Sequence, residues 1–201
     1  RLNDDLESEP NLLQEIPLGE IRPVRLRFYA QDQVAGLGED GQAFVLTFLD
    51  NRIFSAAIGE VANFALLGRT FFLAVRDRGL VSLSFERNEV VEWTGGDSSL
   101  LKMAVLPPDK LFTAHRDGTL REWDSLEKRV TAWAGGMDGL TALAVDHGGR
   151  IYGGDSVGKV RQWDLEKRTV RECSGFARAV RFLRYYPPGK LLAVEDGRPG
   201  S

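Results

Sequence analysis

The chain has 201 residues, of which 43% are hydrophobic, so it can bury a core and is not disordered throughout. Its net charge of −3, with interleaved signs and no run of five Lys or Arg residues, makes nucleic acid an unexpected partner. The single cysteine, Cys173, excludes an internal disulfide, and no apolar run approaches the roughly 18 residues that span a bilayer. We therefore expect a cytoplasmic protein without a membrane partner.

Five glycines at turn positions recur with nearly constant spacing. They are Gly41, Gly79, Gly118, Gly158 and Gly197, at intervals of 38, 39, 40 and 39 residues. Each lies beside short segments rich in β-branched and aromatic residues, which favours strands. A period of about 40 residues built from strands is typical of a propeller blade, whereas helical repeats of this length would show a 3.6-residue periodicity. The sequence predicts an all-β propeller of four-stranded antiparallel blades.

In chain order, the prediction is half a blade, four whole blades and half a blade, in one domain spanning residues 1–201. Residues 1–20 align with the second half of the fourth repeat, so they are expected to supply the third and fourth strands of a blade. Residues 177–201 are expected to supply the first two strands of another, at 180–185 and 191–194. The four whole blades are predicted at residues 21–60, 61–97, 98–137 and 138–176.

The third and fourth repeats show the four strands of a blade most clearly. In the third repeat the Pro107-Pro108 pair ends the first strand, because proline cannot donate a ladder hydrogen bond. The strands predicted for this repeat are 100–106, 111–115, 120–123 and 129–134. Those predicted for the fourth repeat are 140–145, 151–152, 160–163 and 169–173.

The third repeat also carries a recognisable motif. Thr113 lies four residues before Asp117 of an Asp-Gly turn, and Trp123 follows six residues later, directly before Asp124. With these residues the chain resembles the WD-repeat (Trp-Asp repeat) β-propeller family, and it looks like a degenerate member and a partial propeller. The resemblance implies that Thr113, Asp117 and Trp123 are hydrogen-bonded inside the blade. The family's Gly-His before the first strand is absent, since residues 95–97 read Gly-Gly-Asp.

The other repeats keep less of this motif. The fourth repeat retains Trp163 and Asp164 but has Gly153 where the third has its threonine. The first two repeats lack the Trp-Asp pair, and the pairs expected in its place are Leu49-Asp50 and Phe85-Glu86. Trp123 and Trp163 are expected to pack between blades, whereas Trp93 and Trp133, in the outermost strands, are equally consistent with packing and with partner contact.

The resemblance also implies a binding surface. In the family, the turn after the second strand and the start of each blade surround the mouth of the central channel, where peptides and protein surfaces dock. A solvated rim is the alternative interpretation of each such residue. Both charge signs occur in the set, which suits a protein partner better than a polyanion. The candidate partner-binding residues are Glu39, Arg76, Asp77, His115, Arg116, Asp155, Ser156 and Glu195.

No pattern in the sequence indicates a cofactor, a metal or a catalytic site. Residues 36–41 match G-x-G-x-x-G, but strand-like residues follow, whereas a dinucleotide fingerprint needs a helix there. His115, His147 and Cys173 have no partner at metal-ligand spacing. No serine has the flanking glycines of a nucleophile elbow. We expect no enzymatic activity, no cofactor and no metal.

Two architectures remain open at this point. Five blade-equivalents are fewer than the seven that most members of the family have. In the first architecture, the chain is a segment of a seven-bladed propeller, with the other blades on further residues or on a partner chain. In the second, the N-terminal half blade completes the C-terminal one in a five-bladed ring.

The expected function is a protein–protein interaction or scaffold module, as the sensing or regulatory part of a larger multidomain protein or complex. One alternative is an enzyme-associated propeller that gates or binds substrate, which would require ionisable residues with perturbed pKa values in the channel. The other is a nucleic-acid-binding propeller. It would require one basic face formed by Arg25, Arg27, Arg178, Arg181 and Arg184.

Overall fold

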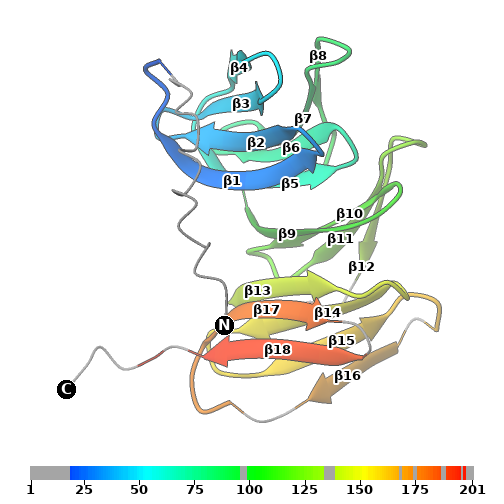
Figure 1. Cartoon of the computed structure of the whole chain (residues 1–201). Helices are drawn as coiled ribbons and strands as arrows, with labels where there is room; N and C mark the ends of the chain where they lie inside the picture. Colours follow the sequence, from blue (N-terminus) through cyan, green and yellow to red (C-terminus); the bar gives the residue numbers. More distant parts are fainter. Residues whose placement is uncertain are drawn as a thin grey trace, which may run out of the picture. The chain divides into compact units, whose positions relative to one another are not determined.

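All regular secondary structure in the described residues of the computed structural model is β-strand (Figure 1). None of these residues forms a helix long and apolar enough to cross a membrane. The chain divides into two compact units, Arg1–Ala56 and Ala57–Ser201. The structure describes residues 19–95, 99–133, 139–167, 169–173, 176–186, 189–195 and 197. The predicted half blade at residues 1–20 lies almost wholly outside them, and the repeat boundaries stay predictions.

The described residues of the first unit form an antiparallel sheet with the strand order β1-β2-β3-β4. Gly36 lies within β2, where a Cβ would come within 2.6 Å of the Phe44 ring and 2.7 Å of the Arg25 carbonyl oxygen. Gly41 follows in the turn, with a φ of 78°, and β3 comes next rather than a helix. The glycine-rich stretch therefore allows neighbouring strands to pack closely and the chain to turn tightly between β2 and β3. The strands are β1 (Pro23–Ala30), β2 (Gln33–Gly38), β3 (Gln42–Thr47) and β4 (Arg52–Ala57).

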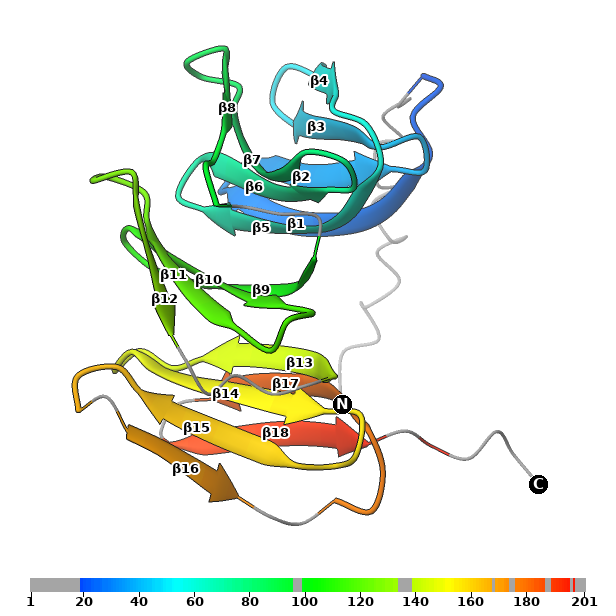
Figure 2. The same ribbon diagram turned by 180° about the vertical axis from the view of Figure 1, so that it is seen from behind.

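The second unit contains three four-stranded antiparallel sheets and a two-stranded one (Figure 2). Strands neighbour one another in chain order in every sheet. The second sheet of the chain comprises β5 (Val61–Leu67), β6 (Thr70–Val75), β7 (Gly79–Ser84) and β8 (Glu89–Glu92). The third comprises β9 (Leu100–Leu106), β10 (Lys110–His115), β11 (Leu120–Asp124) and β12 (Arg129–Trp133). The fourth comprises β13 (Leu140–Val145), β14 (Arg150–Asp155), β15 (Val160–Asp164) and β16 (Thr169–Cys173), and the last pair is β17 (Val180–Tyr186) and β18 (Lys190–Glu195).

The observed strands confirm the all-β prediction, and the third sheet agrees with its predicted strands to within one residue at each end. The largest difference is β14, which runs three residues beyond the predicted end at residue 152. Gly153 and Gly154 weaken a strand pattern in sequence, but here they make room. A Cβ on Gly154 would lie 2.6 Å from Cβ of Val180, so only glycine lets β17 pack this closely on β14.

Strand register corrects the alignment of the first two repeats. Trp123 of β11 lies opposite Leu111, four residues before the end of β10. The same place is held by Leu83 in the second sheet and by Leu46 in the first. The residues in the Asp124 position are then Ser84 and Thr47. The expected counterparts, Leu49-Asp50 and Phe85-Glu86, are therefore wrong.

The turn glycines caused part of this error. Gly118 precedes β11 by two residues, whereas Gly79 is itself the first residue of β7 and pairs with Val75. Gly79 has a φ of 75° and Gly118 one of 76°, so both supply the left-handed residue of their turns. Because the left-handed residue falls one position later in the second sheet, counting from glycine to glycine shifts the repeat.

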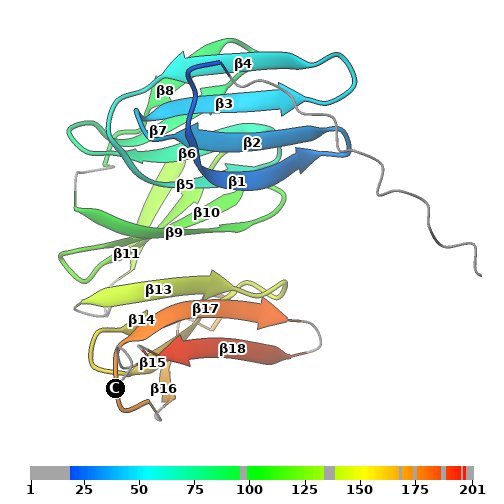
Figure 3. The same cartoon turned by 60° about the vertical axis from the view of Figure 1, so that its left-hand side comes forward.

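Three hydrophobic core clusters of the second unit lie between consecutive sheets. Phe72 and Leu80 of the second sheet pack with Leu111 and Trp123 of the third. Corresponding clusters join the third sheet to the fourth, and the fourth to β17 and β18. The first strands β5, β9, β13 and β17 contact one another in succession (Figure 3). Burial of each large side chain contributes about 1.5–3 kcal/mol, so the stacked sheets form a firm support for their turns.

Candidate functional site

A series of buried side-chain hydrogen bonds runs through the third sheet. Trp123 Nε1 donates to Thr113 Oγ1 at 2.7 Å, and Thr113 Oγ1 lies 2.8 Å from His115 Nε2. His115 Nδ1 lies 3.3 Å from Ser99 Oγ, directly before β9. Thr113 and His115 share one face of β10, because side chains alternate along a strand. With 1% of its surface exposed, His115 belongs to this buried series and not to the exposed rim where it was expected.

Asp117 closes its own turn. Its Oδ1 accepts hydrogen bonds from the Thr119 hydroxyl at 2.6 Å and the Thr119 N–H at 2.9 Å, and its Oδ2 accepts one from Arg121 at 3.4 Å. The Thr119 bonds, the hydroxyl first, hold the pKa of Asp117 below its ordinary value. The resemblance implied a bond into the Thr113 and Trp123 set. In the described residues Asp117 instead bonds within the turn, and His115 is the neighbour of Thr113.

The fourth sheet repeats the tryptophan without its hydrogen bond. Trp163 is 2% exposed, and its indole N–H has no hydrogen-bond partner among the described residues. Gly153 occupies the place that Thr113 has in the third sheet, and a Cβ there would lie 2.8 Å from Cζ3 of Trp163. The ring thus takes the space of a side chain at residue 153. Leaving such a donor buried and unpaired costs about 1–3 kcal/mol.

Asp124 and Asp164 cap the turns that follow β11 and β15. Asp124 Oδ1 accepts the backbone N–H groups of Glu127 at 2.8 Å and Leu126 at 3.0 Å. Asp164 Oδ1 accepts the N–H of Lys167 at 2.9 Å. These backbone donors, chiefly Glu127 and Lys167, lower the pKa of the two carboxyl groups from their ordinary value.

We expect Asp124 to titrate below the ordinary aspartate pKa of about 3.9. A group whose pKa is lowered in the folded state contributes stability above its unfolded pKa and loses it as the pH falls through the folded value. Asp124→Asn should therefore unfold at a lower temperature than the parent chain at pH 7 and at the same temperature near pH 2. Carboxyl NMR and thermal unfolding measure the two effects. A titration at or above the ordinary value would contradict this.

The turn between the second and third strands of each four-stranded sheet, here called a rim turn, is joined to the start of the same sheet by a backbone hydrogen bond. The donor is the N–H of the residue after the second strand, and the acceptor is the carbonyl of the residue before the first strand. Since only main-chain atoms take part, this bond does not depend on the side chain of the donor residue. The donor and acceptor residues are Glu39 and Arg22, Arg76 and Glu60, Arg116 and Ser99, and Ser156 and Gly139, at 2.8–3.1 Å.

The structure leaves six of the eight predicted rim residues exposed. Asp155, like His115, is the exception, with 4% of its surface exposed. Its Oδ1 accepts the N–H groups of Val157 at 3.0 Å and Lys159 at 2.8 Å, so the carboxylate turns back onto its own turn. The expectation that Asp155 faces a partner is corrected accordingly. The exposed residues are Glu39, Arg76, Asp77, Arg116, Ser156 and Glu195.

Among the described residues, charges of both signs on the rim of the second unit lack an ion-pair partner. Arg76 is neutralised by Glu60, with Nε and Oε2 2.5 Å apart. Asp77, Arg116 and Glu195 have no ion-pair partner within the described part of the chain. Rim charges left without an internal partner are available to an incoming protein surface.

A buried carboxylate elsewhere in the fourth sheet, Asp146, is fully engaged in a turn. It is 2% exposed and accepts hydrogen bonds from the N–H groups of Gly148 and Arg150, the Arg150 Nε and the Tyr152 hydroxyl. Burial is the main cause of the raised pKa of Tyr152. With four donors, Asp146 has a structural role between β13 and β14. Among the described residues, no group of three or more His, Cys, Asp or Glu could hold a metal ion.

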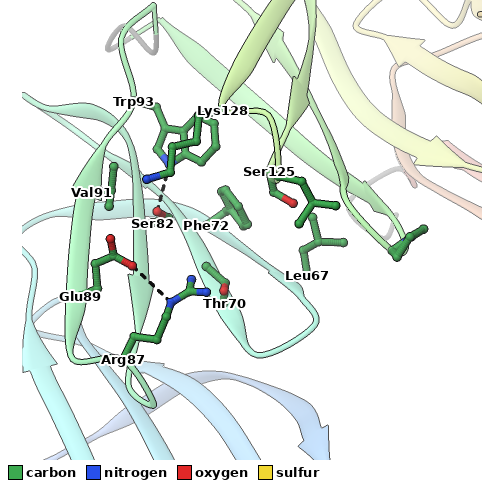
Figure 4. A pocket seen from close by; sticks show the side chains of 12 residues that line it. Leu67, Thr70, Phe72, Ser82, Arg87, Glu89, Val91, Trp93, Ser125 and Lys128 are labelled. Carbon is green, nitrogen blue, oxygen red and sulfur yellow. Dashed lines mark hydrogen bonds and ion pairs between the residues drawn. The ribbon is translucent and has the colours of Figure 1, made fainter.

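Two adjoining pockets of about 200 Å³ each lie between the second and third sheets, next to the turn from β11 to β12. Both are lined by Val91, Trp93 and Lys128, and we call the pair the Trp93 groove; Figure 4 shows the first of the two pockets. The first pocket is also lined by Leu67, Phe72, Leu126 and polar residues, and the second by Trp123 and Val130.

Sequence reasoning left Trp93 undecided and missed Lys128. A clue to Lys128 was present, since Asn51, Asn88 and Lys128 hold the same turn position in the first three sheets. All three have a positive φ, at 52°, 49° and 51°. Asparagine is suited to this conformation and lysine is not. Lys128 is therefore less suited to its backbone conformation than the residues at the same position in the first two sheets. The side chain of Trp133 lies outside the described ones.

No family model matches the chain, and no curated protein matches it. Among solved structures, the crystal structure of the WD40 beta propeller domain of Doa1 is similar, with a TM-score of 0.68 and 16% sequence identity. The similarity covers 85% of this chain and 59% of that one, so the chain spans less than two thirds of the domain it resembles. Together with the repeated four-stranded antiparallel sheets, this likeness shows a β-propeller fold.

Proposed function

We propose that the chain is a non-catalytic protein-interaction module, a degenerate WD-repeat propeller or part of one, acting in the cytoplasm as a scaffold or sensing part of a larger complex. The observation that carries the proposal is the pair of exposed charges Asp77 and Arg116, which have no ion-pair partner among the described residues and lie on turns that a main-chain hydrogen bond holds in place. The single cysteine supports a reducing compartment. The WD40 propeller likeness supports an interaction role in general terms.

A protein or peptide surface fits this rim better than a polyanion. Arg116 lies one repeat from the acidic Asp77, so a partner meets both signs within the second unit. Opposite charges on a partner would raise the association rate and set its orientation. Turns that are already fixed also lose little conformational freedom on binding, which favours affinity.

The test is capture of partners by the intact chain and by a rim variant. We expect the combined substitution Asp77→Lys and Arg116→Glu to reduce recovery of at least one captured protein by about tenfold or more, since both reversed charges would repel the partner surface. Quantitative mass spectrometry of affinity-purified complexes measures the recovery.

Arg129→Glu is the matched control. Arg129 is exposed on β12, away from the rim turns, and pairs only with Glu127 in the described residues. The control should retain every protein whose recovery falls with the rim variant. Equal recovery with the rim variant, or equal loss with the control, would sink the rim proposal.

The outer edge of β18, with which no described strand pairs, favours a second kind of partner. β18 pairs only with β17 in the described residues, whereas β2, β6, β10 and β14 each pair on both sides. Phe182, Leu192 and Val194, each 44–46% exposed, form an apolar face on this hairpin. We propose that another chain or chain segment supplies the third and fourth strands here and so continues the propeller, since an open edge invites pairing.

Hydrogen exchange distinguishes the open edge from a completed one. In the isolated chain, the amides of residues 190–195 that do not bond to β17 should exchange at least tenfold faster than the corresponding amides of β14. In a complex with the strand-donating partner, both sets should exchange at similar rates. Persistently fast exchange in every isolated complex would argue against strand completion.

A further inference from the structure

The Trp93 groove contains a fixed aromatic platform. The Trp93 ring lies 5.7 Å from the Phe72 ring and 5.9 Å from the Trp123 ring, centroid to centroid, and its Nε1 donates to Ser82 Oγ at 2.9 Å. These contacts come from both sheets, so the ring is held even though it is only half-buried. A held, partly exposed indole loses little freedom when a ligand packs on it, which is typical of binding hot spots.

Lys128 reaches the same groove at a conformational cost. It occupies the left-handed region with a φ of 51°, where the first two sheets have asparagine. A lysine there is less stable than asparagine or glycine, and such local strain gathers at functional positions. Figure 4 shows the Lys128 side chain extending from the turn after β11 toward Trp93. The strained residue thus contributes a cation to the apolar platform.

The uncompensated charge of the groove is positive. Arg87 and Glu89 pair with each other at 3.2 Å, and Glu92 pairs with Arg78 at 2.7 Å. Lys128 has no ion-pair partner among the described residues. A carboxylate would therefore find an unpaired ammonium beside an apolar surface.

We propose that the Trp93 groove binds a short acidic peptide segment of a partner protein, in which an aliphatic or aromatic side chain lies next to a carboxylate. The apolar side chain packs on Trp93, Val91 and Leu126, which are the accessible apolar residues of the lining, and the carboxylate pairs with Lys128. This surface differs from the rim in position and in chemistry. Its lining comes from the ends of the sheets that carry the β9–β10 and β11–β12 turns, whereas the rim comprises the turns after β6, β10 and β14.

The experiment uses a random octapeptide library displayed on phage and selected against the intact chain. We expect the selected peptides to combine an apolar residue with Asp or Glu one or two positions away. They should shift the indole N–H resonance of Trp93 and bind the Lys128→Asn variant at least fivefold more weakly. Replacement of their Asp and Glu by Asn and Gln should weaken binding to the parent chain by a similar factor.

Lys128→Asn is a safe variant because asparagine already holds this position in two sheets. Its thermal midpoint should be unchanged or raised by about 1–3 °C, so a loss of binding cannot result from unfolding. Arg116→Glu, on the rim, should leave binding unchanged. Selection of no peptides, of peptides without acidic residues, or of peptides that bind Lys128→Asn as tightly as the parent chain overturns the proposal. So does binding that depends on Arg116 instead.

Discussion

Gly158→Ala is expected to lower the midpoint of thermal unfolding by about 10 °C. Gly158 has a φ of 90°, and a Cβ there would lie 2.3 Å from the Phe176 carbonyl oxygen and 2.8 Å from that of Arg178. Left-handed backbone costs a residue with a Cβ about 1–2 kcal/mol, and a clash with backbone atoms adds about 1–3 kcal/mol. The segment before β17 would have to move away from the β14–β15 turn.

Gly68→Ala separates the two causes. Gly68 has a φ of 57° and is exposed, and no heavy atom of the described residues lies within 4 Å of the position that a Cβ would take there. Alanine at this position incurs the backbone cost alone, so the midpoint should fall by about 3 °C. Differential scanning calorimetry of both variants measures the contrast. Equal losses would show that the residue 176–178 segment moves aside without cost.

Trp123→Phe is expected to lower the thermal midpoint by about 5 °C more than Trp163→Phe. Both tryptophans are 1–2% exposed and hold equivalent places, so the smaller ring removes similar packing from each. Trp123 also loses its hydrogen bond to Thr113, whereas Trp163 loses a donor that has no partner in the described residues. The difference corresponds to about 1–3 kcal/mol for one buried polar group.

Thr113→Val provides the matching control. This substitution removes the hydroxyl oxygen that accepts the Trp123 hydrogen bond. The Trp123 indole N–H is then buried without an acceptor, as the Trp163 indole N–H is among the described residues. In the Thr113→Val background, Trp123→Phe should lower the thermal midpoint no more than Trp163→Phe does in the parent chain. The reason is that the stability losses of two substitutions are not additive when the two residues interact. If Trp123→Phe costs the same with and without Thr113, the hydrogen bond does not account for the difference between the two sheets.

The strands of the third sheet could be predicted because local patterns and turn chemistry agree there. Pro107 and Pro108 end one strand, and Asp117 and Gly118 mark the next turn. β14 was underestimated because Gly153 and Gly154 read as a break, although they fit against side chains far away in sequence. The length of β14 thus depends on tertiary contacts and not on the local strand preference of its residues.

The exposure of the residues at the rim turns could be predicted only in part, and their role in partner binding stays a prediction. His115 and Asp155 end their strands and lie inside, whereas Arg116 and Ser156, one residue later, are exposed. The family pattern identifies the position of each turn. Whether the residue beside the turn is buried or exposed depends on where the strand ends. The Trp93 groove could not be predicted from one repeat, because two sheets contribute its lining.

The main-chain bonds that fasten the rim turns have an evolutionary consequence. Glu39, Arg116 and Ser156 donate the same bond with different side chains, so selection for folding places little constraint on the side chain there. Substitutions at these positions can accumulate while the scaffold remains intact, and related chains could acquire new partners through a handful of neutral changes. The rim would then diverge faster between relatives than the strands that carry it.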